Sequence, residues 1–316
     1  MGRTTMIISA SRRTDIPAFY ADWLINRLKA GSVLLRNPYN PKNISRITFD
    51  RESVDCIVFW TKNAQPMLSK LGLIDAMDYP YYFQFTITPY EKQIERNLPD
   101  KPVIMDTFRR LSSLLGPKRV IWRYDPVIIN QEYSVDYHLD KFGSMCNTLG
   151  SYTEQCVFSF IELYPKIRRN MQGIVKQPVL LADRHKVAQG FAKIAQEYQL
   201  SLATCCEGAD FSLYPIKKAA CIDQKLIEEI TGYSLKPLKD EYQRSACNCL
   251  KSVDIGAYDC CSHGCIYCYA TSNFDRVRAN MRYHESSSPI LTGKLGRETV
   301  SSKAGESLKQ MQTVLF

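Results

Sequence analysis

The chain has 316 residues, of which 45% are hydrophobic, and a formal net charge of +9 at pH 7. This length allows one large α/β domain or two medium-sized domains with a sizeable core. No uncharged apolar run approaches the roughly 20 residues that cross a bilayer, and the apolar stretch near the start is too short for a signal peptide. We therefore expect a cytoplasmic protein that makes no membrane contact.

The positive charge is moderate for this length, and no block of lysines and arginines dominates the sequence. It is compatible with an anionic substrate or a nucleic acid, and equally with a solvated surface that happens to be basic. Charge alone therefore does not identify a partner.

Six short apolar runs alternate with amphipathic segments over the first two-thirds of the chain. The runs are rich in β-branched and aromatic residues, as expected of strands that are covered on both faces. Segments 22–31 and 185–199 carry apolar residues at three- and four-residue spacing, which is typical of helices. The six predicted strands span residues 6–11, 55–61, 81–88, 119–125, 156–162 and 200–206.

This alternation predicts an α/β fold with a parallel sheet and right-handed crossovers. Such a sheet is either open or closed, and we expect a (β/α) barrel or partial barrel of about six to seven parallel strands. Residues 1–204 form its main part, a cysteine-rich region of residues 205–284 completes it, and residues 285–316 form a polar tail.

Polar side chains follow the end of each predicted strand. In parallel β/α folds the carboxyl ends of the strands form the functional face, so six polar clusters in succession predict one converging site. The basic residues among them are suited to bind an anionic substrate, and the acidic residues are suited to pair with them. The candidate catalytic residues are Arg12, Arg13, Asp15, Lys62, Asp125, Glu162 and Glu207.

Twelve cysteines in a chain without secretory features indicate metal or redox chemistry rather than a disulfide framework. Cys56 and Cys156 lie in apolar strand-like runs, and Cys146 lies in a helical segment. We expect these three to be buried structural thiols. All the others fall after residue 204.

The densest group lies in "CCSHGCIYCYA", residues 260–270. Here Cys261, Cys265 and Cys268 form a C-x3-C-x2-C unit, and Tyr267 directly precedes the last cysteine. Three thiolates on one tight loop can hold three irons of a four-iron cluster and leave the fourth iron free for a small ligand. A structural zinc site usually shows two close pairs of ligands instead.

This unit resembles the iron–sulfur loop of radical S-adenosylmethionine (SAM) enzymes, which also have an aromatic residue before the last cysteine. More narrowly, "RSACNCLKSVDIGAYDCCSHGCIYCYA" resembles a bacterial family of domains of unknown function whose C-terminal cysteines have been likened to that loop. The stretches "SRRTDIPAFY", "FWTKN" and "WRYDP" also resemble this family, so the resemblance extends to about residue 284.

The resemblance implies that the three loop cysteines hold a 4Fe-4S cluster and that SAM binds its fourth iron. Reductive cleavage of SAM would then yield a deoxyadenosyl radical that acts on an unidentified substrate, with a flavodoxin- or ferredoxin-type protein as electron donor. Tyr267 would either pack near the adenine of SAM or serve only in packing the loop. The other candidate SAM contacts are Ser11, Thr86, Thr88, Arg123 and Ser159.

In most radical SAM enzymes the cysteine loop follows the first strand of the barrel, whereas here it comes last. A ring of β/α units can be cut between other strands without altering its interior, so we expect a circularly permuted barrel. The run "SVDIGAY", residues 252–258, would then form a strand beside residues 6–11.

Six thiols of the cysteine-rich region lie outside the three-cysteine unit. Four of them would saturate a second cluster, and the resemblance supports this because many radical SAM enzymes carry auxiliary clusters. A structural zinc ion is the main alternative. Cys205 and Cys260 are left over, and each could substitute for a neighbour. The predicted ligands are Cys206, Cys221, Cys247 and Cys249.

Three functions stay open at this stage. The first is a radical SAM enzyme with an auxiliary iron–sulfur cluster. The second is a zinc-stabilised nucleic-acid-binding protein that uses its charge and its 19 tyrosines. The third is an iron–sulfur electron-transfer or redox protein that does not use SAM.

The chain has four histidines. His263 lies inside the cysteine loop, where it would either hydrogen-bond a sulfide or face solvent. We expect His138, His185 and His284 at surface positions of helices.

Overall fold

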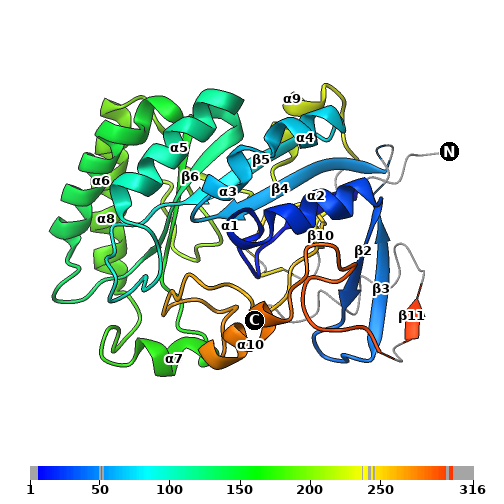
Figure 1. Ribbon diagram of the computed structural model, residues 1–316. Coiled ribbons are helices and arrows are strands. Elements are labelled where there is room, and N and C mark those ends of the chain that lie inside the picture. The colour runs from blue at the N-terminus through cyan, green and yellow to red at the C-terminus, as the bar shows by residue number, and fades with distance from the viewer. Residues whose placement is uncertain are drawn as a thin grey trace.

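The computed structural model describes residues 6–49, 51, 53–236, 238–240, 243–244, 246–296 and 299–301. Its centre is a parallel sheet of eight strands with helices packed around it (Figure 1). In spatial order the strands are β10 (Val253–Asp254), β1 (Met6–Ala10), β4 (Val54–Thr61), β5 (Tyr81–Thr86), β6 (Val120–Val127), β7 (Gln155–Phe160), β8 (Ser201–Thr204) and β9 (Ile216–Lys218).

The predicted α/β fold and parallel sheet are confirmed, and each of the six predicted strands is present with its ends within two residues. A closed barrel is not seen. Within the described residues the sheet runs from an edge at β10 to an edge at β9 and has eight strands rather than six to seven. The edge strands β10 and β9 have only two and three residues. They therefore offer few backbone groups through which the two edges could pair and close the sheet.

The first and last strands of the large sheet lie side by side. β10 pairs in parallel with β1, so that Ile8 lies opposite Val253 and Ser9 lies opposite Asp254. The predicted neighbourhood of "SVDIGAY" and the N-terminal strand is therefore confirmed. The cysteine-rich region thus adds β9 and β10 to the same sheet as the first part of the chain.

The two faces of the sheet pack against different parts of the chain, because successive side chains of a strand point to opposite faces. Phe83 and Trp122 belong to the large core that includes the helices. Their neighbours Tyr82 and Ile121 belong to a second core, which the cysteine-rich segment covers. The cysteine-rich segment, including helix α9 (Gln224–Thr231), therefore covers that face of the sheet.

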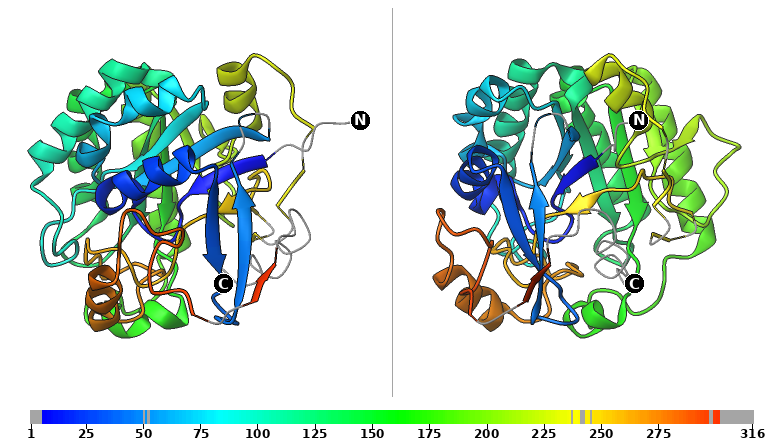
Figure 2. Two further views of the ribbon diagram at one scale, coloured as in Figure 1. Left: turned by 45° about the vertical axis from the view of Figure 1, so that its right-hand side comes forward. Right: turned by 90° about the vertical axis from the view of Figure 1, so that its right-hand side faces the viewer.

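Helices α5, α6 and α8 lie together at the far side of the sheet from β2 and β3 (Figures 1 and 2). The predicted helices at 22–31 and 185–199 correspond to α2 and α8. The helices are α1 (Ile16–Phe19), α2 (Ala21–Lys29), α3 (Gln65–Leu68), α4 (Leu71–Ala76), α5 (Lys101–Leu115), α6 (Val135–Leu149), α7 (Pro165–Met171), α8 (Leu181–Glu197), α9 (Gln224–Thr231), α10 (Phe274–Arg282) and the 3-10 turns η1 (Pro117–Arg119) and η2 (Gly150–Tyr152).

A second, three-stranded sheet lies beside β1 and α2 (Figure 2). Its order is β11 (Thr299–Ser301), β3 (Asn43–Thr48) and β2 (Ser32–Arg36), and β2 and β3 form an antiparallel hairpin. The chain after the cysteine loop returns to this region, where the Leu34 amide donates to Pro289 O at 2.8 Å. Residues 302–316 of the predicted tail lie outside the described residues.

The three thiols predicted to be structural are buried: Cys56 packs in the second core, whereas Cys146 and Cys156 pack in the large one. Burial raises the pKa of each of them. The histidine prediction is wrong for His138, which is fully buried within α6 because its ring hydrogen-bonds two buried oxygen atoms.

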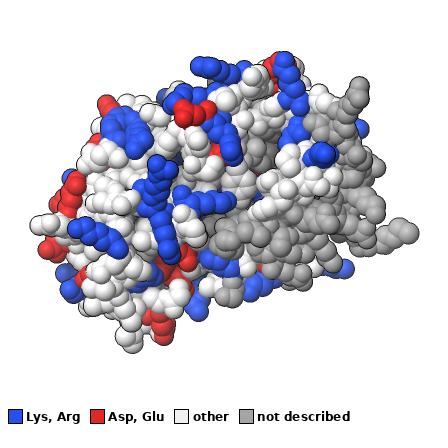
Figure 3. Space-filling model, turned by 90° about the horizontal axis from the view of Figure 1, so that it is seen from below, with Lys and Arg blue, Asp and Glu red and all other residues white. Residues whose placement is uncertain are grey.

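Seen from below, Lys and Arg side chains gather over part of the surface, with Asp and Glu among them and toward the edges (Figure 3). Helices α7 and α10 lie at this lower side in Figure 1. Within the described part of the chain, no helix has both the length and the apolar character to span a membrane. The exposed basic residues of the two helices are Lys166, Arg168, Arg169, Arg276, Arg278 and Arg282.

Candidate functional site

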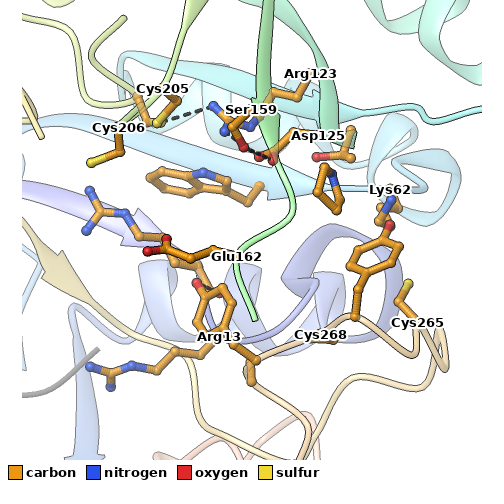
Figure 4. Close-up of a pocket in the computed structure, with 18 of the residues that line it drawn as sticks. Arg13, Lys62, Arg123, Asp125, Ser159, Glu162, Cys205, Cys206, Cys265 and Cys268 are labelled. Carbon is orange, nitrogen blue, oxygen red and sulfur yellow. Dashed lines mark hydrogen bonds and ion pairs between the residues drawn. The ribbon is translucent and has the colours of Figure 1, made fainter. Parts of the chain in front are cut away.

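A cavity of about 320 Å³ lies at the carboxyl ends of the parallel strands. Thr61, Thr86 and Ser159, which end or nearly end β4, β5 and β7, line its wall. Cysteines from two separate groups also face it: Figure 4 places Cys205 and Cys206 on one side and Cys265 and Cys268 on the other. The cysteines on the wall are Cys205, Cys206, Cys221, Cys247, Cys249, Cys261, Cys265 and Cys268.

Every predicted site residue lines this cavity except Thr88. Thr88 is buried behind the wall, where its hydroxyl donates to Glu95 Oε1 at 2.7 Å. The carboxyl ends of parallel strands therefore do bring the predicted residues together. The predicted non-cysteine residues on the wall are Ser11, Arg12, Arg13, Asp15, Lys62, Thr86, Arg123, Asp125, Ser159, Glu162, Glu207 and Tyr267.

The loop that carries Cys261, Cys265 and Cys268 is fixed to the segment that follows β5. The Asn97 amide donates to His263 O at 2.9 Å, and the Ile266 amide donates to Ile94 O at 3.0 Å. Gly264 adopts φ +71, and a Cβ atom there would lie 2.9 Å from Asn97 Nδ2. Glycine therefore allows both the turn of this loop and its close approach to the neighbouring segment.

Asp15 joins three parts of the site. Its carboxylate accepts a hydrogen bond from the Lys62 amide at 2.7 Å and from the Ala18 amide at 3.0 Å, which caps α1. His263 Nε2 lies 2.7 Å from the same carboxylate. His263 is only 4% exposed, so the prediction that it faces solvent is wrong: Asp15 is its partner. This contact ties the cysteine loop to the segments after β1 and β4.

A second buried carboxylate, Glu95, lies beside the cysteine loop, where its backbone pairs with that of Cys265, and is 1% exposed. It accepts hydrogen bonds from Lys62, Lys101, Thr88 and Tyr267. Burial alone would raise the pKa of Glu95, but the two ammonium groups outweigh it and lower the pKa to about 2. The hydroxyl of Tyr267 is therefore directed to a carboxylate, while the residue also lines the cavity.

Burial raises the pKa of all three thiols of the cysteine loop. The other two thiols add to this effect at Cys261, and Cys268 adds to it at Cys265. The charge of Lys62 opposes it at Cys265 and Cys268. Buried thiols that disfavour one another's negative charge on one cavity wall suit a cationic metal group, which would stabilise them as thiolates.

Five interacting cysteines lie on the other side of the cavity. Cys205 Sγ lies 3.2 Å from Cys221 Sγ. Cys206 has φ 57, which breaks the alternation of side chains after β8, so that two consecutive thiols reach the ring. In order around this five-thiol ring, each thiol shifts the pKa of its two neighbours; the members are Cys205, Cys221, Cys249, Cys247 and Cys206.

The two cysteines left unassigned by the sequence have different positions. Cys205 belongs to the five-thiol ring. Cys260 is buried outside the cavity wall, and its thiol donates to Ala257 O at 3.0 Å. The structure thus adds Cys205 to the candidate ligands and gives Cys260 a packing role.

Two arginines place positive charge beside the ring. Arg123 Nη1 donates to Cys221 Sγ at 3.0 Å, and its Nη2 pairs with Asp125 at 2.6 Å. The guanidinium of Arg12 lies 5.2 Å from the centre of the Trp60 ring. The neighbouring thiols of Cys205 and Cys249, together with the charges of both arginines, lower the pKa of Cys221 well below the usual thiol range.

The remaining predicted acids are held in ion pairs. Glu207 accepts from Arg184 Nη1 and from the Phe160 amide, both at 2.7 Å, and burial raises its pKa. Glu162 pairs with Arg244. These contacts favour a structural contribution of both carboxylates to the cavity wall.

Ser11 also has a structural partner. It is 2% exposed, and its hydroxyl donates to Asp254 Oδ1 at 2.7 Å. Asp254 accepts further hydrogen bonds from Ser9 Oγ and the Arg12 amide, both at 2.8 Å. One carboxylate at the end of β10 therefore fixes the end of β1.

One family of proteins matches the chain over residues 7–270, and its description is Domain of unknown function (DUF1848). The chain belongs to the DUF1848 family. The match extends from β1 to the end of the cysteine loop, so the large sheet and both cysteine groups of this DUF1848 domain lie within it. No curated protein and no solved structure matches the chain.

The cysteines of the DUF1848 domain fit a metal group through their number and chemistry. Within the described residues, no group of three or more His, Cys, Asp or Glu side chains already surrounds a point suited to one metal ion. In the five-thiol ring, the hydrogen bond between Cys205 Sγ and Cys221 Sγ requires a proton on one of the two sulfurs, while the surroundings of Cys221 favour its thiolate form. Metal binding would remove the protons that remain on the ring, and four thiolates would satisfy either a zinc ion or a 4Fe-4S cluster.

Sequence reasoning missed Glu95 and Asp254, which hold parts of the DUF1848 site in place, and it left the role of Cys205 open. Glu95 lies in a polar stretch with no motif, and Asp254 lies in a two-residue strand. Cys205 was visible, but its adjacency to Cys206 left the choice between them open. Only the contacts made across the fold give these residues their positions.

Proposed function

We propose that this chain is a radical SAM enzyme that binds a 4Fe-4S cluster through Cys261, Cys265 and Cys268 and acts on an unidentified substrate. One observation carries the proposal: these cysteines face a cavity at the carboxyl ends of a parallel sheet, together with a second thiol group. When bound, the cluster and SAM would supply one-electron cleavage of SAM to a deoxyadenosyl radical.

The eight-stranded sheet is, in this proposal, a circularly permuted partial barrel. The pairing of β10 with β1 supports it, because the strand before the cysteine loop then neighbours the first strand of the chain. A permutation changes the order of the strands along the chain and leaves their carboxyl ends on one side of the sheet.

The residues of this chain would hold the loop and receive SAM. Asp15 and His263 fix the loop against the ends of β1 and β4. Thr86 and Tyr267, both half-buried on the wall, would contact SAM, whose carboxylate would find positive charge at Arg13 or Lys62.

The five-thiol ring would hold an auxiliary 4Fe-4S cluster. Four thiolates are sufficient for it, and Arg123 would balance part of their charge through its contact with Cys221. Cys206, Cys221, Cys247 and Cys249 remain the proposed ligands, with Cys205 as the alternative to Cys206.

We assign the electron donor to the flavodoxin or ferredoxin type and the compartment to the cytoplasm. The exposed basic residues of α7 and α10 would suit an acidic donor protein (Figure 3). All twelve cysteines are free thiols, which fits a reducing compartment.

Anaerobic reconstitution with iron and sulfide, followed by reduction in the presence of SAM, tests this function. We expect visible absorption from the clusters and formation of deoxyadenosine. The matched control is the C261A/C265A/C268A variant, which should keep the iron of the five-thiol ring and form no deoxyadenosine.

Other outcomes would select the other functions. Clusters in the wild-type protein without deoxyadenosine would support an electron-transfer or redox protein. A colourless zinc protein whose nucleic-acid affinity falls steeply with salt would support the nucleic-acid-binding alternative. Either result would contradict the radical SAM assignment.

A further inference from the structure

We propose that the charge of Lys62 raises the reduction potential of the cluster on the cysteine loop, an inference that rests on the proposed function of that loop. Lys62 follows β4, and its backbone amide is fixed by Asp15 at 2.7 Å. Its side chain is 15% exposed and lines the cavity. The ammonium group is therefore held in place at the wall beside the cysteines.

The buried group around Glu95 has an excess of one positive charge. Lys62 Nζ lies 2.7 Å from Glu95 Oε1, and Lys101 pairs with the other carboxylate oxygen. The two remaining donors to Glu95, Thr88 and Tyr267, are neutral. Two ammonium groups thus share one carboxylate, and neither lysine side chain is more than 15% exposed. In such a poorly solvated place, a charge acts strongly on its neighbours.

Lys62 is the lysine of this pair that faces the cysteine loop. Its Nζ lies 5.4 Å from the centre of the Tyr267 ring. Tyr267 lies between Cys265 and Cys268 in the sequence. Lys101 begins α5, and the cavity wall does not include it.

An electron taken up by a cluster adds negative charge without forming or breaking a bond. A fixed positive charge nearby lowers the energy of the reduced state more than that of the oxidised state. Removal of the Lys62 charge should therefore shift the reduction potential to more negative values. The same substitution at Lys101 should cause a smaller shift, because its charge lies behind Glu95.

The test is a reduction-potential titration of the reconstituted full-length protein, with dithionite as the one-electron reductant. Electron paramagnetic resonance would follow the cluster signal that changes when SAM is added, which separates the loop cluster from an auxiliary one. The variants are Lys62→Gln, which loses the charge and keeps an amide donor, Lys62→Arg, which keeps the charge, and Lys101→Gln as the matched control.

We expect a more negative potential in K62Q, a potential near that of the wild type in K62R, and a smaller shift in K101Q. A wild-type potential in K62Q, or an equal shift in K101Q, would overturn the inference. If K62Q fails to fold by circular dichroism, K62M replaces it. If folded K62Q or K62M takes up no iron on the cysteine loop while K62R does, the loop cluster depends on the charge of Lys62, which would support the inference.

A wild-type protein without any SAM-sensitive cluster signal would be a different result. It would remove the proposed function together with this inference. A wild-type signal with a potential that does not respond to the Lys62 charge would remove the inference alone.

Discussion

Two adjacent cysteines show how the fold separates residues that the sequence cannot. Cys260 and Cys261 follow each other in the chain, but only Cys261 lines the cavity. The thiol of Cys260 donates to Ala257 O, and its carbonyl accepts from Tyr20 OH. The different surroundings of the two side chains thus assign one thiol to packing and the other to the candidate metal site.

This difference predicts the iron content of two neighbouring variants. C260A should retain the wild-type iron content after reconstitution, because its thiol lies outside the wall. C261A should lose about half of the iron, since one of two four-iron clusters would lack a ligand. Iron and sulfide assays on both purified proteins, with circular dichroism as a check of folding, provide the measurement. A loss of iron in C260A, or a full complement in C261A, would contradict the assignment of these cysteines.

At the residue scale, the sequence predicted the site residues whose polar side chains directly follow an apolar strand. Polar residues after apolar strands were expected at the carboxyl edge of the sheet, and only Thr88 among the site candidates lies off the cavity wall. Glu95 and Asp254 were missed because their importance comes from donors far away in sequence. Lys62 precedes Glu95 by 33 residues, and Ser9 precedes Asp254 by 245.

At the scale of elements, the junction of β1 and β10 is the contact on which the position of the cysteine loop depends. Gly256, two residues after β10, touches Ser11 so closely that a Cβ atom would lie 2.0 Å from its Oγ. The same Oγ donates to Asp254. A side chain at position 256 would therefore displace Ser11 from the carboxylate that fixes both strand ends.

We expect G256A to lower the free energy of unfolding by about 1–3 kcal/mol through overpacking. The matched control is G143A in α6, where a Cβ atom meets nothing within 4 Å. There alanine should leave stability unchanged or raise it by up to about 1 kcal/mol, because it has the higher helix propensity. Urea unfolding of both variants measures this, and equal stability of G256A and the wild type would contradict the proposed close packing.

The elements themselves were predictable to different degrees. Long apolar runs gave the six central strands, because strands covered on both faces need apolar residues throughout. The β2 and β3 hairpin was missed, since buried residues in β2 alternate with partly exposed ones and the pattern is short. A (β/α) barrel or partial barrel was expected, but the described strands form a sheet with two edges, and these edge strands are its shortest.

At the scale of the whole molecule, the core contains a histidine that should make stability depend on pH. His138 Nε2 lies 2.7 Å from Ile128 O, and its Nδ1 lies 2.8 Å from Tyr124 OH. A carbonyl can only accept, so Nε2 carries the proton in the neutral ring, and Nδ1 accepts from the tyrosine. Burial lowers the pKa of His138 from 6.5 to about 4.

The folded state therefore keeps His138 neutral at a pH where the unfolded chain already binds a proton. Its contribution to stability is fully present above pH 6.5 and is lost as the pH falls from 6.5 to 4. The loss amounts to about 3 kcal/mol, at roughly 1.4 kcal/mol per unit of pKa shift.

Urea unfolding of the metal-free chain tests this prediction. The stability of H138Q should depend less on pH over this range than that of the wild type. N147A, an exposed and uncharged position on α6, should retain the wild-type dependence. An equally steep loss of stability in H138Q would show that other groups control the acid response.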